Sequence, residues 1–157
     1  METENRARTE MEKSCRALLE KRMAKSDCYD AWLQPRFASC DPETSTLSLL
    51  YDVSHCLRNP SGVIHGGAAA GMLTIAMETL ADYVNQNAEI DPVSQNFFYE
   101  RALPVGGELL VTARFQGSRD GLTLISAAAC DPRRPEKICD TCDGVYRIRK
   151  GGAEVGS

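Results

Sequence analysis

The segment from Gly66 to Tyr83 constrains the fold more than any other, because it is apolar on nearly every side. Its apolar residues are Ala68, Ala69, Ala70, Met72, Leu73, Ile75, Ala76, Met77, Leu80 and Ala81. We predict that it forms a helix running to about Asn85. A helix that is apolar almost all round is buried, so the rest of the chain must supply a sheet that wraps around it.

The segments on both sides of this helix alternate between apolar and polar residues, with the period of half-buried strands. Strands are predicted at 36–39, 47–53, 93–99, 109–116, 122–130 and 138–149. Short turns join the last three strands, including an Asp120-Gly121 hairpin turn, and this makes them antiparallel neighbours. An antiparallel sheet around one buried helix is an α+β architecture.

A further helix is predicted from about Thr3 to Lys25, where Leu18, Leu19 and Met23 form a narrow apolar stripe among many charged residues. Such a helix lies on the surface of a domain. The predicted organisation is therefore an N-terminal helical extension at 1–34, one α+β domain at 35–150 and a flexible tail at 151–157.

Charge and cysteine content exclude several classes of protein. The 18 basic and 22 acidic residues give a net charge of -4 and are spread along the chain. Nucleic acid is therefore not expected as the main partner, because phosphate binding needs a concentrated basic face. No apolar run approaches the roughly 20 residues of a membrane span, and the charged N-terminus does not resemble a secretory signal. Seven irregularly spaced cysteines favour reduced thiols, so a cytoplasmic location is predicted.

The start of the central helix has the features of a site for a developing negative charge. His65 is followed by Gly66, Gly67 and three alanines. The first amides of a helix have no intrahelical partner and carry the positive end of the macrodipole. Glycine lets a ligand atom approach these amides closely, and such donors stabilise oxyanions.

Polar residues on the central helix allow two interpretations. Thr74, Glu78 and Asp82 are spaced at i, i+4 and i+8, so they share one side of the helix. This side either faces solvent or lines a cleft in which a hydroxyl and a carboxylate lie one turn apart. In a cleft, a carboxylate of this kind could activate a water molecule.

The pattern Asn59-x-x-Gly62-x-x-His65-Gly66-Gly67, followed by an apolar helix and four strands, resembles the hotdog-fold acyl-CoA thioesterases. The resemblance covers about 47–149 and is strongest to the PaaI-like branch, which contains the phenylacetate-pathway and 4-hydroxybenzoyl-CoA thioesterases. It implies a hotdog fold, a homodimer formed edge to edge and possibly a dimer of dimers. It also implies an acyl-CoA substrate bound at the dimer interface, with coenzyme A as part of the substrate and no metal or separate cofactor.

The resemblance also assigns roles to individual residues. The thioester carbonyl oxygen would point at the amide of Gly66 or Gly67, and Asn59 and His65 would shape the pocket. The family places a carboxylate nine residues after the histidine, where this chain has Thr74, and a hydroxyl one turn later, where it has Glu78.

This exchange of hydroxyl and carboxylate leaves two functions open. In the first, the protein hydrolyses an acyl-CoA to a free acid and CoA, with Glu78 as general base, Thr74 positioning the water and Ser94 reaching in from the next strand. In the second, it binds an acyl-CoA or another acyl ligand without turnover, because Thr74 replaces the acid. A dehydratase of the same fold is less well supported, because the Asp and His pair of that chemistry is not found.

Other signals are weaker. Arg101 and Arg119 are candidates for contacts with the CoA phosphates, with Arg133 and Arg134 as further options. Cys139-x-x-Cys142 lacks the second pair of a structural zinc site, and strand residues three apart point to opposite faces, so no metal site is predicted. The neighbours His55 and Cys56 lack a third group for nucleophilic catalysis.

Overall fold

The structure, a computed structural model, describes residues 2–86, 88–103 and 105–149; the predicted tail at 151–157 lies outside them. The elements in chain order are α1 (Glu2–Met23), α2 (Tyr29–Leu33), β1 (Arg36–Asp41), β2 (Thr46–Asp52), η1 (His55–Leu57), α3 (Gly66–Val84), β3 (Ile90–Tyr99), β4 (Glu108–Arg119), β5 (Leu122–Cys130) and β6 (Ile138–Ile148). The predicted order of helix, two strands, long helix and four strands is confirmed.

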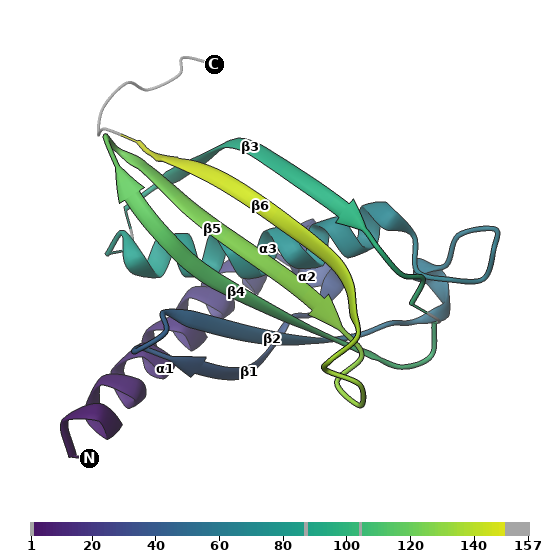
Figure 1. Cartoon of the computed structure of the whole chain (residues 1–157), viewed down its shortest axis with the longest axis horizontal. Helices are drawn as coiled ribbons and strands as arrows, with labels where there is room; N and C mark the ends of the chain where they lie inside the picture. The colour runs from purple at the N-terminus through teal and green to yellow at the C-terminus, as the bar shows by residue number, and fades with distance from the viewer. Residues whose placement is uncertain (1, 87, 104, 150–157) are drawn as a thin grey trace.

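The six strands form one antiparallel sheet in the order β1-β2-β4-β5-β6-β3. Figure 1 shows this sheet curving over α3, with α1 beside α3 and next to β1. The predicted α+β architecture, an antiparallel sheet around a long central helix with an additional N-terminal helix, is therefore present. None of the described helices is both long and apolar enough to cross a membrane.

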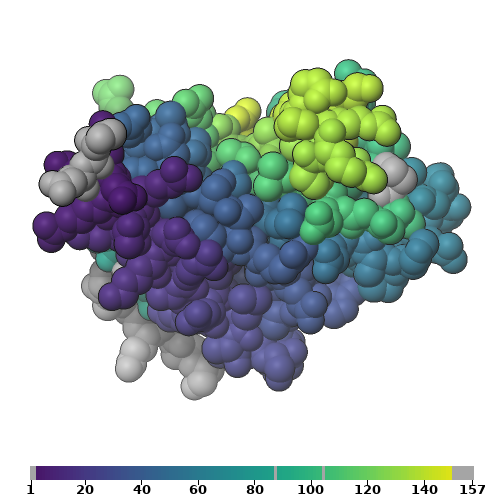
Figure 2. Space-filling view, turned by 90° about the horizontal axis from the view of Figure 1, so that it is seen from below, coloured from purple at the N-terminus to yellow at the C-terminus, as the bar shows by residue number. Residues whose placement is uncertain are grey.

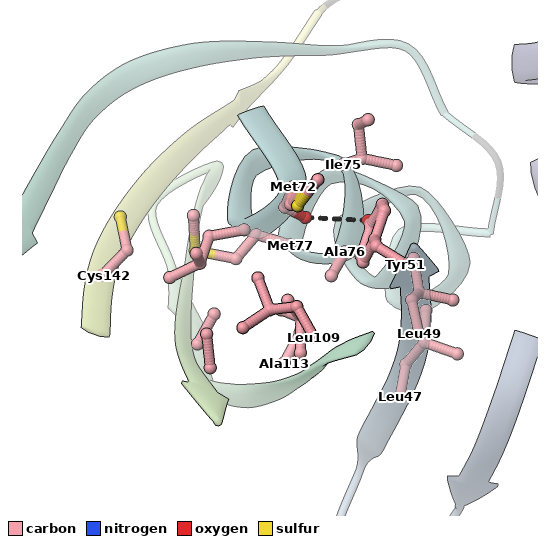
Figure 3. Packing of buried hydrophobic residues seen from close by; sticks show 14 of the residues in the cluster. Leu47, Leu49, Tyr51, Met72, Ile75, Ala76, Met77, Leu109, Ala113 and Cys142 are labelled. Carbon is pink, nitrogen blue, oxygen red and sulfur yellow. Dashed lines mark hydrogen bonds between the residues drawn. The ribbon is translucent and has the colours of Figure 1, made fainter. Parts of the chain in front are cut away.

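The core lies between α3 and the concave face of the sheet, as the apolar pattern of α3 predicted (Figure 3). The sheet residues that face the helix there include Leu47, Leu49, Tyr51, Leu109 and Ala113. The buried Tyr51 hydroxyl donates a hydrogen bond to the Met72 carbonyl oxygen at 2.8 Å, which satisfies a polar group that burial would otherwise penalise.

Helix α1 is part of this core along one face. Met11, Cys15 and Leu19, one helical turn apart, are almost completely buried and belong to the same apolar cluster as α3. Figure 2 shows α1, in purple, lying over the blue strands β1 and β2. The buried stripe extends further toward the N-terminus than the predicted stripe, because Cys15 and Met11 continue it.

Candidate functional site

The first turn of α3 leaves one backbone donor available. His65 caps the helix, and its Nδ1 accepts a hydrogen bond from the Gly67 N–H at 3.0 Å. The Ala68 and Ala69 N–H groups both donate to the His65 carbonyl oxygen. Within the described ranges, the Gly66 N–H has no acceptor. Of the two amides that the sequence proposed, Gly66 therefore offers the donor that a ligand can use.

A pocket of about 280 Å³ opens beside this turn. Its lining residues are Asn59, Val63, Ile64, Gly66, Ala69, Tyr99, Glu100, Arg101, Ala102, Leu103 and Asp140. Figure 2 shows the yellow-green segment that joins β5 to β6 at the same end of the molecule as the blue loop before α3. Three predicted site residues, Asn59, Gly66 and Arg101, thus come together at one pocket.

Asn59 acts on the loop that forms one wall of the pocket. Its side-chain oxygen accepts hydrogen bonds from the backbone N–H groups of Ser61, at 2.9 Å, and Val63, at 3.3 Å. Gly62 adopts a φ of 80°, which residues other than glycine rarely adopt. The Asn59 and Gly62 of the sequence motif therefore fix the turn that leads into His65.

Tyr99 connects β3 to the start of α3. Its hydroxyl donates to the Gly66 carbonyl oxygen at 3.3 Å, and a Cβ atom added at Gly66 would lie 3.3 Å from the Tyr99 ring. In the pairing of β3 with β6, Tyr99 lies opposite Asp140. Residues directly opposite each other share one face of a sheet, so the Asp140 side chain is on the face that meets α3.

Asp140 is a buried carboxyl group at this pocket, with an exposed fraction of 4%. Among the described residues, no side chain or backbone group donates a hydrogen bond to it. Burial is the larger cause that raises the pKa of Asp140 to about 6, and the charge of Glu100 adds to it. Asp140 is not among the site residues predicted from the sequence. The available signal was its position in β6, two and six residues before the inward-facing Cys142 and Tyr146.

The raised pKa of Asp140 predicts a pH-dependent stability. Its usual pKa is 3.8, so between that value and about 6 the folded protein holds a proton that the unfolded chain releases. The stabilisation is present below pH 3.8 and is lost as the pH rises through 6. Relative to Asp140→Asn, the wild type should lose about 2 kcal/mol between pH 4 and 8. Urea unfolding of both proteins at several pH values measures this, and parallel curves would contradict it.

The predicted base, Glu78, lies in a second polar cluster. Arg22 of α1 donates to Glu78 at 2.9 Å, to Asp82 at 2.8 Å and to Asp30 at 3.3 Å. About a fifth of each of the Arg22, Glu78 and Asp82 side chains is exposed. Burial raises the pKa values of Glu78 and Asp82, and the Arg22 guanidinium offsets part of this rise. Arg22 could not be predicted from the sequence, because no pattern in neighbouring residues indicates that a charged side chain of α1 will contact α3.

The polar side of α3 is therefore neither fully solvent-facing nor simply an open cleft. Glu78 and Asp82 line a pocket of about 420 Å³, but Arg22 of α1 lines it too and holds both carboxylates. Twelve residues of α3 separate Gly66 from Glu78, which is about 18 Å along the helix axis. Within one chain the two cannot act on the same carbonyl group.

Thr74 contacts β3 rather than the carboxylates. Its hydroxyl donates to the Gln95 side-chain oxygen at 3.2 Å, and the Gln95 amide donates to the Tyr146 hydroxyl at 2.9 Å. Successive strand residues point to opposite faces of a sheet, so the exposed Ser94 is directed away from α3. Within one chain, the side chain of β3 that contacts α3 here is therefore Gln95, and not Ser94 as predicted.

The predicted phosphate-binding arginines separate in space. Arg101 lines the pocket beside Gly66. Arg119 is the last residue of β4, next to the turn that leads to β5; its side chain is 90% exposed and pairs with Asp120 at 3.3 Å. This turn is at the end of the sheet opposite Tyr99, so Arg119 does not reach the pocket of its own chain. Arg133 pairs with Asp131 at 2.8 Å.

The cysteines of the Cys139-x-x-Cys142 motif are both free and buried. In the part of the chain that the structure describes, no three His, Cys, Asp or Glu residues are placed to hold a metal ion. Cys56 is free and exposed, and its sulfur lies 2.9 Å from the Ser54 hydroxyl.

Comparisons with known proteins agree on the fold. No protein-family model and no curated protein sequence matches the chain. Among solved structures, zebrafish thioesterase superfamily member 2 matches with a TM-score of 0.74 and 19% identity, over 85% of this chain and 94% of that one. The E. coli PaaI protein of the phenylacetic acid degradation operon matches with a TM-score of 0.75 and 14% identity, over 90% of this chain and 97% of that one. The chain has the hotdog fold.

A third hotdog neighbour was solved with a ligand. The protein smu.793 of Streptococcus mutans, bound to acetyl-CoA, matches with a TM-score of 0.65 and 10% identity, over 76% of this chain and 92% of that one. At these identities the likeness establishes the hotdog architecture, while the chemistry has to be argued from the residues of this chain.

Proposed function

We propose that this hotdog protein is an acyl-CoA thioesterase, which hydrolyses a thioester to a free acid and CoA. The observation that carries the proposal is the unpaired Gly66 N–H, which opens onto a pocket at the positive end of α3. The thioesterase-superfamily neighbours support the reaction class, and the neighbour with bound acetyl-CoA supports a CoA-type ligand.

The residues around Gly66 suit this chemistry. The thioester carbonyl oxygen would accept the Gly66 N–H bond, which strengthens as negative charge develops on that oxygen. His65 keeps the Gly67 amide occupied and so fixes the first turn of the helix. Asn59 holds the pocket loop, and Arg101 offers a charge for the phosphates of CoA.

A homodimer, alone or as half of a dimer of dimers, is part of the proposal. Strand β3 is an edge of the sheet, so among the described residues one side of its backbone has no partner strand. Its Val93, Phe98 and Tyr99 side chains are about half exposed. An exposed edge with apolar side chains favours pairing with another chain. Glu78 and Arg119 lie far from Gly66 in their own chain, so they could act at that amide only if the other chain of such a dimer supplied them.

A panel of acyl-CoA thioesters tests the reaction. Short-chain, long-chain and aromatic acyl-CoA compounds are incubated with the wild-type protein, and a thiol reagent measures released CoA. We expect at least one class to be hydrolysed well above the rate without protein. Absence of thiol release from every compound would contradict the proposal.

The role of Glu78 as base remains a prediction, and a matched pair of variants decides it. Glu78→Gln and Asp82→Asn each remove one carboxylate charge from Arg22, so they perturb the same ion-pair cluster. A loss of roughly a hundredfold in kcat confined to Glu78→Gln would support a base at Glu78. Equal rates in the two variants would exclude it.

Binding without turnover is the second candidate function, and the pairing of Glu78 with Arg22 and the presence of Thr74 favour it. Calorimetric titration with the same acyl-CoA compounds separates the two functions. Saturable binding together with no thiol release would establish this alternative.

A further inference from the structure

We propose that Asp140 is the general base of the thioester hydrolysis and that it acts in the same chain as the Gly66 amide. The inference rests on the proposed thioesterase function and adds to it a residue that neither the sequence motif nor the comparisons assign.

The geometry places a proton acceptor, the Asp140 carboxylate, and a hydrogen-bond donor, the Gly66 N–H, at one pocket. Gly66 and Asp140 both line the pocket of about 280 Å³, one from the first turn of α3 and the other from β6. Tyr99 joins the two elements, since its hydroxyl contacts the Gly66 carbonyl oxygen and its backbone pairs opposite Asp140. A carbonyl group held at Gly66 would therefore lie in the space that Asp140 faces.

Asp140 has no structural partner that explains its burial. The residue is 96% buried and its carboxyl oxygens keep only slight solvent contact at the pocket, yet in the described ranges no hydrogen bond or salt bridge is found to them. A buried carboxylate without a partner destabilises a protein. Buried polar groups of this kind are found at functional sites, where a substrate or a water molecule supplies the missing contacts.

The other carboxylates are less well placed. Glu78 is bound to Arg22 in an ion pair and, within its own chain, lies about 18 Å along α3 from Gly66. Glu100 also lines the pocket, but its side chain is exposed. The charge of Glu100 contributes to the raised pKa of Asp140. The remaining titratable groups that line the pocket are Tyr99 and Arg101; α3 and the loop at 59–64 contribute no charged side chain to it.

The proposed step balances without any further reactant. The Asp140 carboxylate takes a proton from water, the water oxygen bonds to the thioester carbon, and the carbonyl electron pair moves onto the oxygen held by Gly66. When this intermediate collapses, the carbon–sulfur bond breaks and the sulfur takes the proton from Asp140. The products are a free acid and the CoA thiol, and Asp140 is regenerated as a carboxylate.

The pKa of about 6 suits this role. At neutral pH the carboxylate form predominates, and it is a stronger base than an ordinary aspartate. The wild-type kcat/KM should therefore fall as the pH drops below about 6.

The decisive experiment compares Asp140→Asn with Asp143→Asn on the acyl-CoA that the wild type hydrolyses best. Asp143 lies three residues further along β6, is exposed and pairs opposite Asn96, so this control removes the same charge from the same strand. We expect Asp140→Asn to lower kcat by at least a hundredfold with little change in KM. Asp143→Asn should keep the wild-type rate.

Three outcomes have separate meanings. Wild-type kcat in a folded Asp140→Asn protein would overturn the role of Asp140 and leave the thioesterase proposal standing. No hydrolysis by the wild type would overturn the thioesterase proposal itself. Should Asp140→Asn fail to fold, as circular dichroism would show, the wild-type pH profile decides: a kcat/KM that stays constant from pH 8 down to 5 would overturn the inference.

Discussion

Gly66→Pro should lower kcat/KM for acyl-CoA hydrolysis roughly a hundredfold to a thousandfold relative to Gly66→Ala. Proline has no backbone N–H, so this substitution removes the donor that we propose for the oxyanion. Alanine keeps the N–H. Both substitutions add a Cβ atom, which would lie 3.3 Å from the Tyr99 ring, so Gly66→Ala controls for that contact.

The local backbone makes this comparison feasible. Gly66 is the first residue of α3, the helical position where proline is favoured. His65 has a φ of -68° and a ψ of 130°, the extended conformation that a residue before proline adopts. Thermal unfolding of the two variants should give similar midpoints. Equal kcat/KM values would mean that the Gly66 amide does not stabilise the transition state.

Arg22→Met should destabilise the protein by about 3 to 5 kcal/mol. The substitution keeps much of the apolar stem of Arg22 but removes the guanidinium, and it leaves Glu78 and Asp82 as neighbouring, mostly buried carboxylates. Urea unfolding at pH 7 measures the loss. The deficit should shrink at acid pH, because burial raises the pKa of both carboxyl groups and they are readily protonated once the cation is absent.

Two comparisons show whether the loss comes from the ion-pair cluster. Arg6→Met removes an arginine from the same helix at a site that is 81% exposed, and its pair with Glu10 contributes little, so stability should change by less than about 1 kcal/mol. The triple variant Arg22→Met, Glu78→Gln, Asp82→Asn should recover much of the loss, because no buried charge remains unpaired. A deficit in Arg22→Met no larger than in Arg6→Met would contradict the prediction.

The α+β architecture was predictable because its signals are local, whereas the hotdog fold was implied by the family resemblance. The apolar run of α3 indicates a buried helix wherever it occurs, and the alternation in 109–116 indicates a half-buried strand. The Asp120-Gly121 turn then fixes β4 and β5 as antiparallel neighbours. The first turn of α3 was predictable for the same reason, since His65, Gly66 and Gly67 are adjacent in the chain and define the helix start themselves.

The sequence could not indicate which side chains meet across elements. Seventy-four residues separate Gly66 from Asp140, and only the pairing of β6 with β3, together with the contact of Tyr99 on α3, brings them to one pocket. Likewise, the packing of α1 on α3 decides that Arg22 contacts Glu78.

The sequence by itself therefore determined the main elements, their order and two candidate amides at the start of α3, of which the structure leaves Gly66 available. Only the tertiary structure decided which carboxylates could serve that amide. The physical reason is that helix and strand periodicities depend on near neighbours in the chain, whereas strand register and helix packing depend on the shapes of surfaces that only folding brings together.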